Sequence, residues 1–305
     1  MIWQKIQANK GVTLIELMIV LVIAGILVGG IYTLFATQQR SYFVQDRVTG
    51  IQQDARAVLT FMARDVRMAG FLSGAGSASG FTDGSTTFAI SGFNYALNPV
   101  NSTTGPDALT VVLGVDELGV VQSTAGTLVT LNNNVASSNT FVSFDLQSGT
   151  LYQATPDGTN VMPVINFPAG DTTVGGKAYG VQAITYQVQN GVLQRAINAG
   201  TAQPLAGDGT TTFVEDLQFA YQVEGDTGWY NDPATDFPAG SSQADIEMVR
   251  INVTVRTAVA DATVQDEVPA AQFNQPALED HTTTLAGPDG FRRRVYTTEV
   301  KVRNL

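Results

Sequence analysis

The sequence predicts an α+β protein in which one long N-terminal helix packs its second half on a mainly antiparallel β head. Two observations carry this prediction. Residues 12–69 contain no proline, and apolar residues recur there at helical spacing. Beyond residue 80, short runs that alternate between apolar and polar residues are separated by loops rich in Gly, Pro and Asp. We expect the head to form two sheets or one strongly curved sheet.

The first half of the predicted helix is apolar enough to enter a membrane. No residue from Leu17 to Gln39 carries a formal charge, and twelve of the nineteen residues at 17–35 are Leu, Ile, Val or Phe. Their transfer favours insertion by about 4 to 7 kcal/mol, which exceeds the cost of one acid near the end of the segment. A transmembrane segment over about 14–36 is therefore expected despite Glu16. Two lysines in the first ten residues put the N-terminus on the cytoplasmic side.

A secretory signal peptide and a plain membrane anchor are the ordinary explanations of such a segment. The apolar run is longer than the roughly 7–15 residues of a signal peptide, and no Ala-x-Ala cleavage site follows it. A signal peptide also has no use for a carboxylate in its apolar core. Glu16 therefore needs another explanation.

The residues around this acid resemble a known signal. Residues 10–18 read Lys-Gly-Val-Thr-Leu-Ile-Glu-Leu-Met before the apolar helix, and they resemble the class III signal of type IV pilins and type II secretion pseudopilins. The resemblance implies cleavage after Gly11 by prepilin peptidase, N-methylation of the new terminus at Val12, and a subunit-pairing role for Glu16. Val12 departs from the commoner phenylalanine.

A fibre of parallel apolar helices gives Glu16 a physical role. Such a fibre buries each subunit's N-terminal ammonium among its neighbours, where a charge persists only if it is paired. A carboxylate one turn along a neighbouring helix can neutralise that ammonium and fix the axial register of the two subunits.

Other stretches narrow the resemblance to the PilW family of minor pilins and, more distantly, to GspJ pseudopilins. These are residues 61–71, residues 214–221, an acidic loop with Trp229, the strand at 249–256, and the ending at 292–298. The resemblance covers both ends of the chain well and residues 72–210 poorly. Chain length favours the PilW family.

The resemblance implies a structural function, not an enzyme. A minor pilin of this kind inserts in the inner membrane as a single-pass protein and primes type IV pilus assembly with other minor pilins. It then stands at or near the pilus tip on the cell surface. Its implied partners are the other minor pilins, the major pilin, prepilin peptidase and the inner-membrane assembly platform. The alternatives are a GspJ-like pseudopilin, or a surface adhesin or calcium-dependent binding module that uses residues 72–210.

Charge and cysteine usage limit the function further. The net charge is −11, and residues 72–290 alone carry −18. An acidic head suits solvated display and argues against nucleic-acid binding, because phosphate contacts need Lys and Arg. The chain has no cysteine, which excludes disulfides and thiolate chemistry.

The predicted organisation is a leader at 1–11, a helix at 12–70, a linker at 71–80 and a β head at 81–305. Gly70 is expected to end the helix. The second helical half carries an amphipathic stripe, which predicts packing against the head. Its members are Val44, Val48, Ile51, Ala55, Val58, Met62, Val66 and Ala69.

Short alternating segments predict the strands of the head, and Asn190-Gly191 between two of them predicts a hairpin. Long loops are expected at 99–106, 199–211, 224–243 and 261–290. The strand segments are 109–113, 127–131, 140–146, 184–188, 192–196, 217–223, 249–255 and 293–302.

Few residues suggest chemistry. His281 is the only histidine, which excludes a His-based triad or a His-rich metal site, and we expect it in an exposed loop. No nucleotide-binding, serine-hydrolase or zinc-protease motif is present, and no cofactor is expected. Asp226, Asp232 and Asp236 could supply oxygen ligands to calcium, but they fit no EF-hand spacing, and solvated acidic loops are common. The basic residues at 292–294 are expected to flank the last strand.

Overall fold

The computed structural model describes residues 12–71, 82–83, 95–138, 141–144, 150–164, 167, 174–198, 200–210, 212–257, 276–281 and 289–303. The predicted leader at 1–11 and all but the first residue of the predicted linker at 71–80 lie outside these ranges. The chain divides into two compact units, Met1–Thr49 and Gly50–Leu305.

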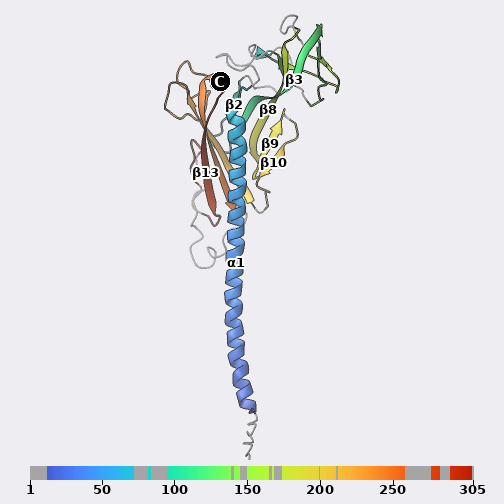
Figure 1. Ribbon diagram of the computed structural model, residues 1–305. Coiled ribbons are helices and arrows are strands. Elements are labelled where there is room, and N and C mark those ends of the chain that lie inside the picture. Colours follow the sequence, from blue (N-terminus) through green and yellow to red (C-terminus); the bar gives the residue numbers. More distant parts are fainter. Residues whose placement is uncertain are drawn as a thin grey trace, which may run out of the picture. The chain divides into compact units, whose positions relative to one another are not determined.

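A single helix, α1 (Leu14–Arg67), is the first element of the described chain (Figure 1). It passes through Gly29 and Gly30 without interruption. In the first unit the apolar side chains of α1 are exposed, for example Leu21 at 74%. Such a surface is stable only in an apolar environment supplied by a membrane or by other subunits.

The strands of the second unit form two sheets. The path of the ten-stranded sheet is β1-β6-β5-β8-β3-β4-β7, with β2 added on β3, and β9 and β10 added on β8; the three-stranded sheet has the order β11-β12-β13. Only β1 and β6 pair in parallel among the described strands. The first sheet contains β1 (Thr82–Asp83), β2 (Leu97–Val100), β3 (Ala108–Ala125), β4 (Leu128–Leu131), β5 (Phe141–Phe144), β6 (Thr150–Gln153), β7 (Val161–Pro163), β8 (Lys177–Gln189), β9 (Val192–Ile197) and β10 (Gln203–Ala206). The second contains β11 (Thr212–Val223), β12 (Ile246–Thr257) and β13 (Arg293–Lys301), and a short 3-10 helix, η1 (Gln243–Asp245), precedes β12.

The hairpin between β8 and β9 turns at the predicted Asn190-Gly191 pair. Both residues have positive φ, 53° and 75°, as a two-residue turn of the type I′ class requires. A Cβ added to Gly191 would lie 2.2 Å from the ring of Phe213. This glycine therefore serves both the turn and the close approach of β11.

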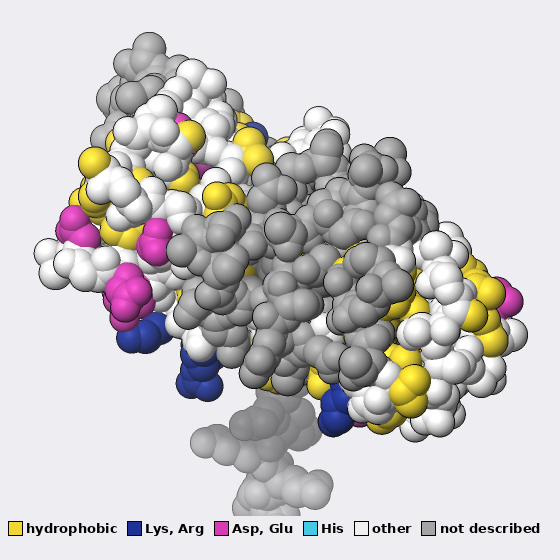
Figure 2. Space-filling view, turned by 90° about the horizontal axis from the view of Figure 1, so that it is seen from above, with side chains coloured by type: hydrophobic (Ala, Val, Ile, Leu, Met, Phe, Trp, Pro, Cys, Tyr) yellow, Lys and Arg dark blue, Asp and Glu magenta, His cyan; other side chains and the backbone are white. Residues whose placement is uncertain are grey.

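On one face of the head, the described Lys and Arg side chains are dispersed (Figure 2). On the face shown in Figure 2, Lys and Arg side chains of the described residues stand apart and form no continuous basic patch. This agrees with the negative charge of residues 72–290. The described surface on this side therefore lacks the electrostatic footprint of a nucleic-acid-binding face.

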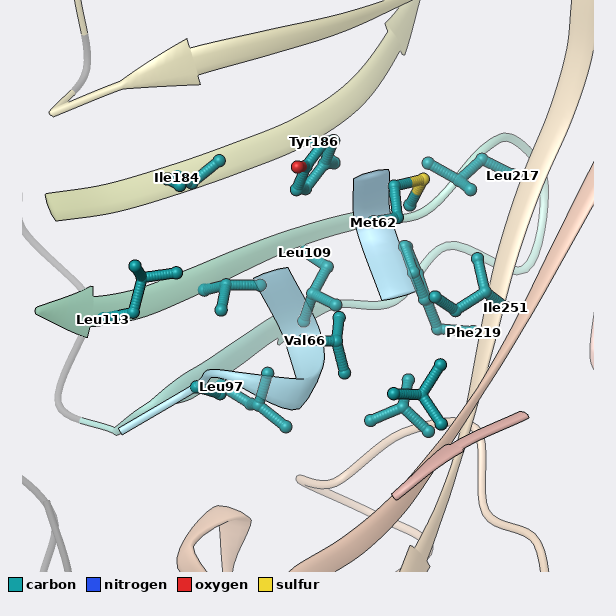
Figure 3. Packing of buried hydrophobic residues seen from close by; sticks show 14 of the residues in the cluster. Met62, Val66, Leu97, Leu109, Leu113, Ile184, Tyr186, Leu217, Phe219 and Ile251 are labelled. Carbon is teal, nitrogen blue, oxygen red and sulfur yellow. The ribbon is translucent and has the colours of Figure 1, made fainter. Parts of the chain in front are cut away.

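The end of α1 supplies one wall of the main core. Met62 and Val66 point toward Leu109 and Tyr186 of the first sheet and toward Phe219 of the second (Figure 3). The described members of the predicted stripe that are buried here are Ala55, Val58, Met62, Val66 and Ala69. The side chains of Val44, Val48 and Ile51 lie outside the described set. Gly70 follows the helix with φ 78° and donates its N–H to the carbonyl of Val112 at 2.9 Å.

A second hydrophobic core lies at the far end of β3. It gathers side chains from β3 to β8, including the ring contacts of Phe144, Tyr152 and Phe167, with centroids 5.0 to 5.9 Å apart. β3 and β8 contribute to both cores because they pair antiparallel along much of their length. Two irregularities in that register, at 114–116 and 117–119, mark the passage between the cores.

The architecture confirms the predicted α+β class and the antiparallel head, which forms two sheets. Two of the predicted loops were wrong in part. β10 lies inside the predicted loop at 199–211, and β2 extends into the predicted loop at 99–106. Pro99 is tolerated in β2 because that strand pairs with β3 alone among the described strands, so one side of its backbone needs no ladder donor.

Candidate functional site

The predicted processing bond lies at the border of the described residues. Gly11 is outside them, whereas Val12 is exposed just before α1. Within the described chain, Leu14–Gln39 is the one helical stretch long and apolar enough to cross a membrane, and its most apolar window has no buried residue.

Glu16 caps the first turn of its own helix. Its Oε2 atom accepts hydrogen bonds from the backbone N–H of Thr13 at 3.0 Å and from the Thr13 hydroxyl at 3.1 Å. The hydroxyl oxygen in turn accepts the backbone N–H of Glu16 at 3.3 Å. This reciprocal arrangement is a capping box. The signal for it, Thr and Glu three residues apart before an apolar run, is present in the sequence.

The capping box leaves part of the Glu16 carboxylate available. Both bonds use Oε2, and Oε1 has no partner within residues 12–71 or the other described ranges. A carboxylate can accept several hydrogen bonds, so the cap and an ammonium from another subunit are compatible.

The candidate calcium ligands use their carboxylates within their own loop. Asp226 accepts the backbone N–H of Gly228 at 2.7 Å and the hydroxyl of Tyr230 at 2.9 Å, and these bonds hold its pKa below the ordinary value. Asp232 accepts the N–H of Ala234, and Asp236 accepts the N–H of Asp232. Searched over the described residues alone, the chain has no group of three or more His, Asp or Glu side chains placed to hold a metal ion.

His281 is buried, so its predicted place in an exposed loop was wrong. It is 6% exposed, and its Nδ1 atom lies 2.6 Å from Oδ2 of Asp216 on β11. A carboxylate 65 residues away in sequence offers the imidazole a partner that no local pattern reveals. Because both side chains are almost fully enclosed, we interpret the pair as a structural contact between the turn at 278–281 and the second sheet.

Asp107 is a second buried carboxylate near this pair. Its two oxygens accept the backbone N–H groups of Ser102 and Phe219 at 2.8 and 2.9 Å. Burial raises its pKa to about 7, with smaller contributions from the charges of Asp280 and Asp216, although the two N–H bonds act in the opposite direction. The loop before β3 is thereby tied to β11.

A third polar contact joins α1 to the first sheet. The hydroxyl of Tyr186 donates to Oδ2 of Asp65 at 2.6 Å, and Arg195 lies 3.4 Å from the same oxygen. Burial and the bond to Asp65 raise the pKa of Tyr186. Asp65 stands beside the apolar stripe, so this contact sets the rotation and height of the helix against the sheet.

Residues 292–294 were predicted only to flank the last strand, but Arg293 also forms ion pairs. The Arg293 side chain is 5% exposed and forms paired bonds to Glu215 on β11 and to Asp289. The Arg256 guanidinium lies over the rings of Phe213 and Phe291, 4.6 and 4.5 Å from their centroids. These contacts hold the start of β13 against β11.

A protein-family model described as the prokaryotic N-terminal methylation motif matches residues 6–32. The chain therefore carries a prokaryotic N-terminal methylation motif. The match includes Gly11, Val12 and Glu16 and extends over residues 14–32 of the apolar span. Together with that span, the motif supports a membrane-anchored component of a pilus or pseudopilus.

Comparisons over the whole chain add little. No curated protein matches the sequence. Among solved structures, the type IV-like pilin TTHA1219 from Thermus thermophilus is similar to this chain at 13% identity and a TM-score of 0.40, over 83% of this chain and 97% of that one. A likeness this distant is no basis for inferring function.

Proposed function

We propose that the protein is a minor pilin that primes type IV pilus assembly at or near the pilus tip. The methylation motif at 6–32, which overlaps the exposed apolar stretch Leu14–Gln39, is the observation that carries the proposal. The residues that resemble the PilW family support the finer assignment. The protein would be a single-pass inner-membrane protein before assembly and part of the fibre afterwards.

The partners proposed for this function are other minor pilins, the major pilin, prepilin peptidase and the inner-membrane assembly platform. Deleting the gene separates this proposal from its alternatives. Loss of fibres is expected for a minor pilin, whereas loss of secretion with intact fibres indicates a pseudopilin. Intact fibres that no longer attach indicate an adhesin.

Processing between Gly11 and Val12 is the first requirement of the proposal. Intact-mass analysis of the membrane-extracted protein should show loss of residues 1–11 and the addition of one methyl group. A retained leader, or a new terminus near Thr37, would contradict the proposal and restore the anchor and signal-peptide explanations.

Glu16 is proposed to pair with the N-terminal ammonium of the subunit above. A subunit at the very tip has no ammonium above it. A buried carboxylate without a partner would destabilise the assembly by roughly several kcal/mol, the effective desolvation penalty of one ion. We therefore place this protein just below the tip, under a partner that lacks the glutamate.

The capping box provides a matched control for the pairing. Glu16→Gln keeps a capping side chain at this position and removes the charge, whereas Glu16→Ala removes both. Both variants should insert in the membrane, and both should recruit the tip partner less well in co-purification or in crosslinking from residue 16. If Glu16→Gln recruits the partner normally and only Glu16→Ala fails, the cap and not the charge pair explains Glu16.

A further inference from the structure

One side of α1 in the second unit carries three arginines. Arg56, Arg64 and Arg67 are exposed, and at 3.6 residues per turn they fall within an arc of about 80°. Thr60 lies inside this arc, and Phe61, which is 56% exposed, lies beside it. The opposite side of the same helical segment is buried in the main core. We call these five residues the basic face.

The arginines of the basic face make no ion pair with the described part of the head. Other cations there do: Arg250 pairs with Glu299, Arg293 with Glu215, and Lys301 with Glu247. Arg64 and Arg67 stand in the last turn of α1, where a cation is favoured by the helix dipole. Arg56 is three turns earlier, so the dipole does not account for it.

The head also has a surface of opposite charge. No Lys or Arg occurs from residue 196 to residue 249. The connection at 224–245 between β11 and β12 carries five acids: Glu224, Asp226, Asp232, Asp236 and Asp245. We call this connection the acidic loop.

The acidic loop is organised before any partner binds. The carboxylates of Asp226 and Asp232 accept backbone N–H groups within the loop, at 2.7 and 2.9 Å. The 3-10 helix that ends it is closed by a capping box between Ser242 and Asp245. Glu224 and Asp236 are exposed. Preformed charge of this kind lowers the ordering cost of binding a cation.

We propose that the basic face of α1 docks against the acidic loop of a second copy of this chain. Charge complementarity supports this occupant: the basic face has no ion pair within its own described head, and the acidic loop of the same chain carries five acids and no Lys or Arg. Phe61 adds apolar area beside the arginines. The proposal rests on the proposed function in one respect, because it needs subunits that stand side by side in a membrane.

The absence of cysteine makes this contact easy to test by crosslinking. Two copies of the full chain that differ in size are co-expressed in membranes, one with Thr60→Cys and the other with Ala234→Cys. Both positions are exposed and leave every charge in place. A short bis-maleimide should join the two copies. The matched control replaces Ala234→Cys with Ala136→Cys, another exposed alanine, and should give no product.

Charge reversal then identifies the partner surface. Arg56→Glu, Arg64→Glu and Arg67→Glu together should lower the crosslinked fraction about tenfold, which corresponds to roughly 1.4 kcal/mol. Glu224→Lys, Asp232→Lys and Asp236→Lys in the other copy should restore it. Reversal without restoration would overturn the proposal and indicate an anionic lipid or another acidic subunit. Crosslinking that is insensitive to reversal would also overturn it.

The same samples keep this test apart from the proposed function. The intact mass of each copy reports whether residues 1–11 have been removed. If the chains are processed and membrane-bound but residues 60 and 234 do not crosslink, the docking proposal fails and the proposed function stands. If the leader is retained, the proposed function fails first.

Discussion

Replacing Tyr186 with Phe tests how α1 is held on the sheet. The ring of Tyr186 is fully buried, and Phe fills the same space, so the substitution removes the hydroxyl and leaves no cavity. A hydrogen bond to a charged group contributes about 1.5 to 3 kcal/mol. In the variant, the Asp65 carboxylate still has Arg195 as a partner at 3.4 Å. The Asp65 side chain is also 17% exposed, so water can replace part of the lost hydrogen bond. We therefore expect Tyr186→Phe to lower the free energy of unfolding by about 1.5 kcal/mol, the lower end of that range.

The loss can be measured by urea unfolding of the processed full chain in detergent, followed by intrinsic fluorescence. The midpoint should fall while the slope stays the same. Tyr179→Phe is the matched control, because Tyr179 is also buried on β8 and its hydroxyl makes no hydrogen bond to a described residue. That variant should differ from wild type by less than about 0.5 kcal/mol.

A double-mutant cycle with Asp65→Asn isolates the contact. If the hydroxyl and the carboxylate interact as described, the two losses should not add, and the coupling should be about 1 kcal/mol. Equal losses in Tyr186→Phe and Tyr179→Phe, or a coupling of zero, would refute the reasoning. The helix would then be held by its apolar stripe alone.

Two further predictions concern the head. A truncated chain that begins near Gln38 should be soluble and unfold cooperatively without reductant or added metal, because the main core already includes the second half of α1; unfolding caused by a chelator would instead support a calcium site. For Asp107, the folded-state pKa of about 7 lies above the ordinary 3.8, so its stabilisation is complete below about pH 4 and is lost as the pH rises through 7. Asp107→Asn should lose one backbone hydrogen bond at every pH, but it should also remove the pH dependence that Asp107 gives to the free energy of unfolding. The stability of this variant relative to wild type should therefore improve from pH 4 to pH 8. A difference that does not change with pH would rule out the titration of Asp107.

Local patterns predicted the helix, the hairpin and most strands because their causes are local. The stripe of Ala55, Val58 and Met62 repeats at helical spacing, and Asn190-Gly191 needs only its own backbone angles. Gly70 ends the helix with the positive φ that glycine adopts readily. These features do not depend on which distant strand lies opposite.

The features that sequence patterns missed depend on partners far along the chain. His281 contacts Asp216, which lies 65 positions away in the sequence. β10 forms where Gln203 and Pro204 pair with β9. The length of β3 was underestimated because its register shifts interrupt the alternation beyond Gly114. The cap formed by Thr13 and Glu16 is an exception, because its Thr-x-x-Glu signature is a local pattern.

The continuity of β3 and β8 through two cores bears on mechanical load. The strands pair antiparallel from Leu109–Tyr186 to Val120–Lys177, so tension along this ribbon acts on many backbone hydrogen bonds at once and does not open them one by one. Force applied to the second hydrophobic core reaches α1 through the main core, where the hydroxyl of Tyr186 on β8 is hydrogen-bonded to Asp65. Force applied to the second core is therefore carried by the β3–β8 pairing and by the contact of α1 with the first sheet.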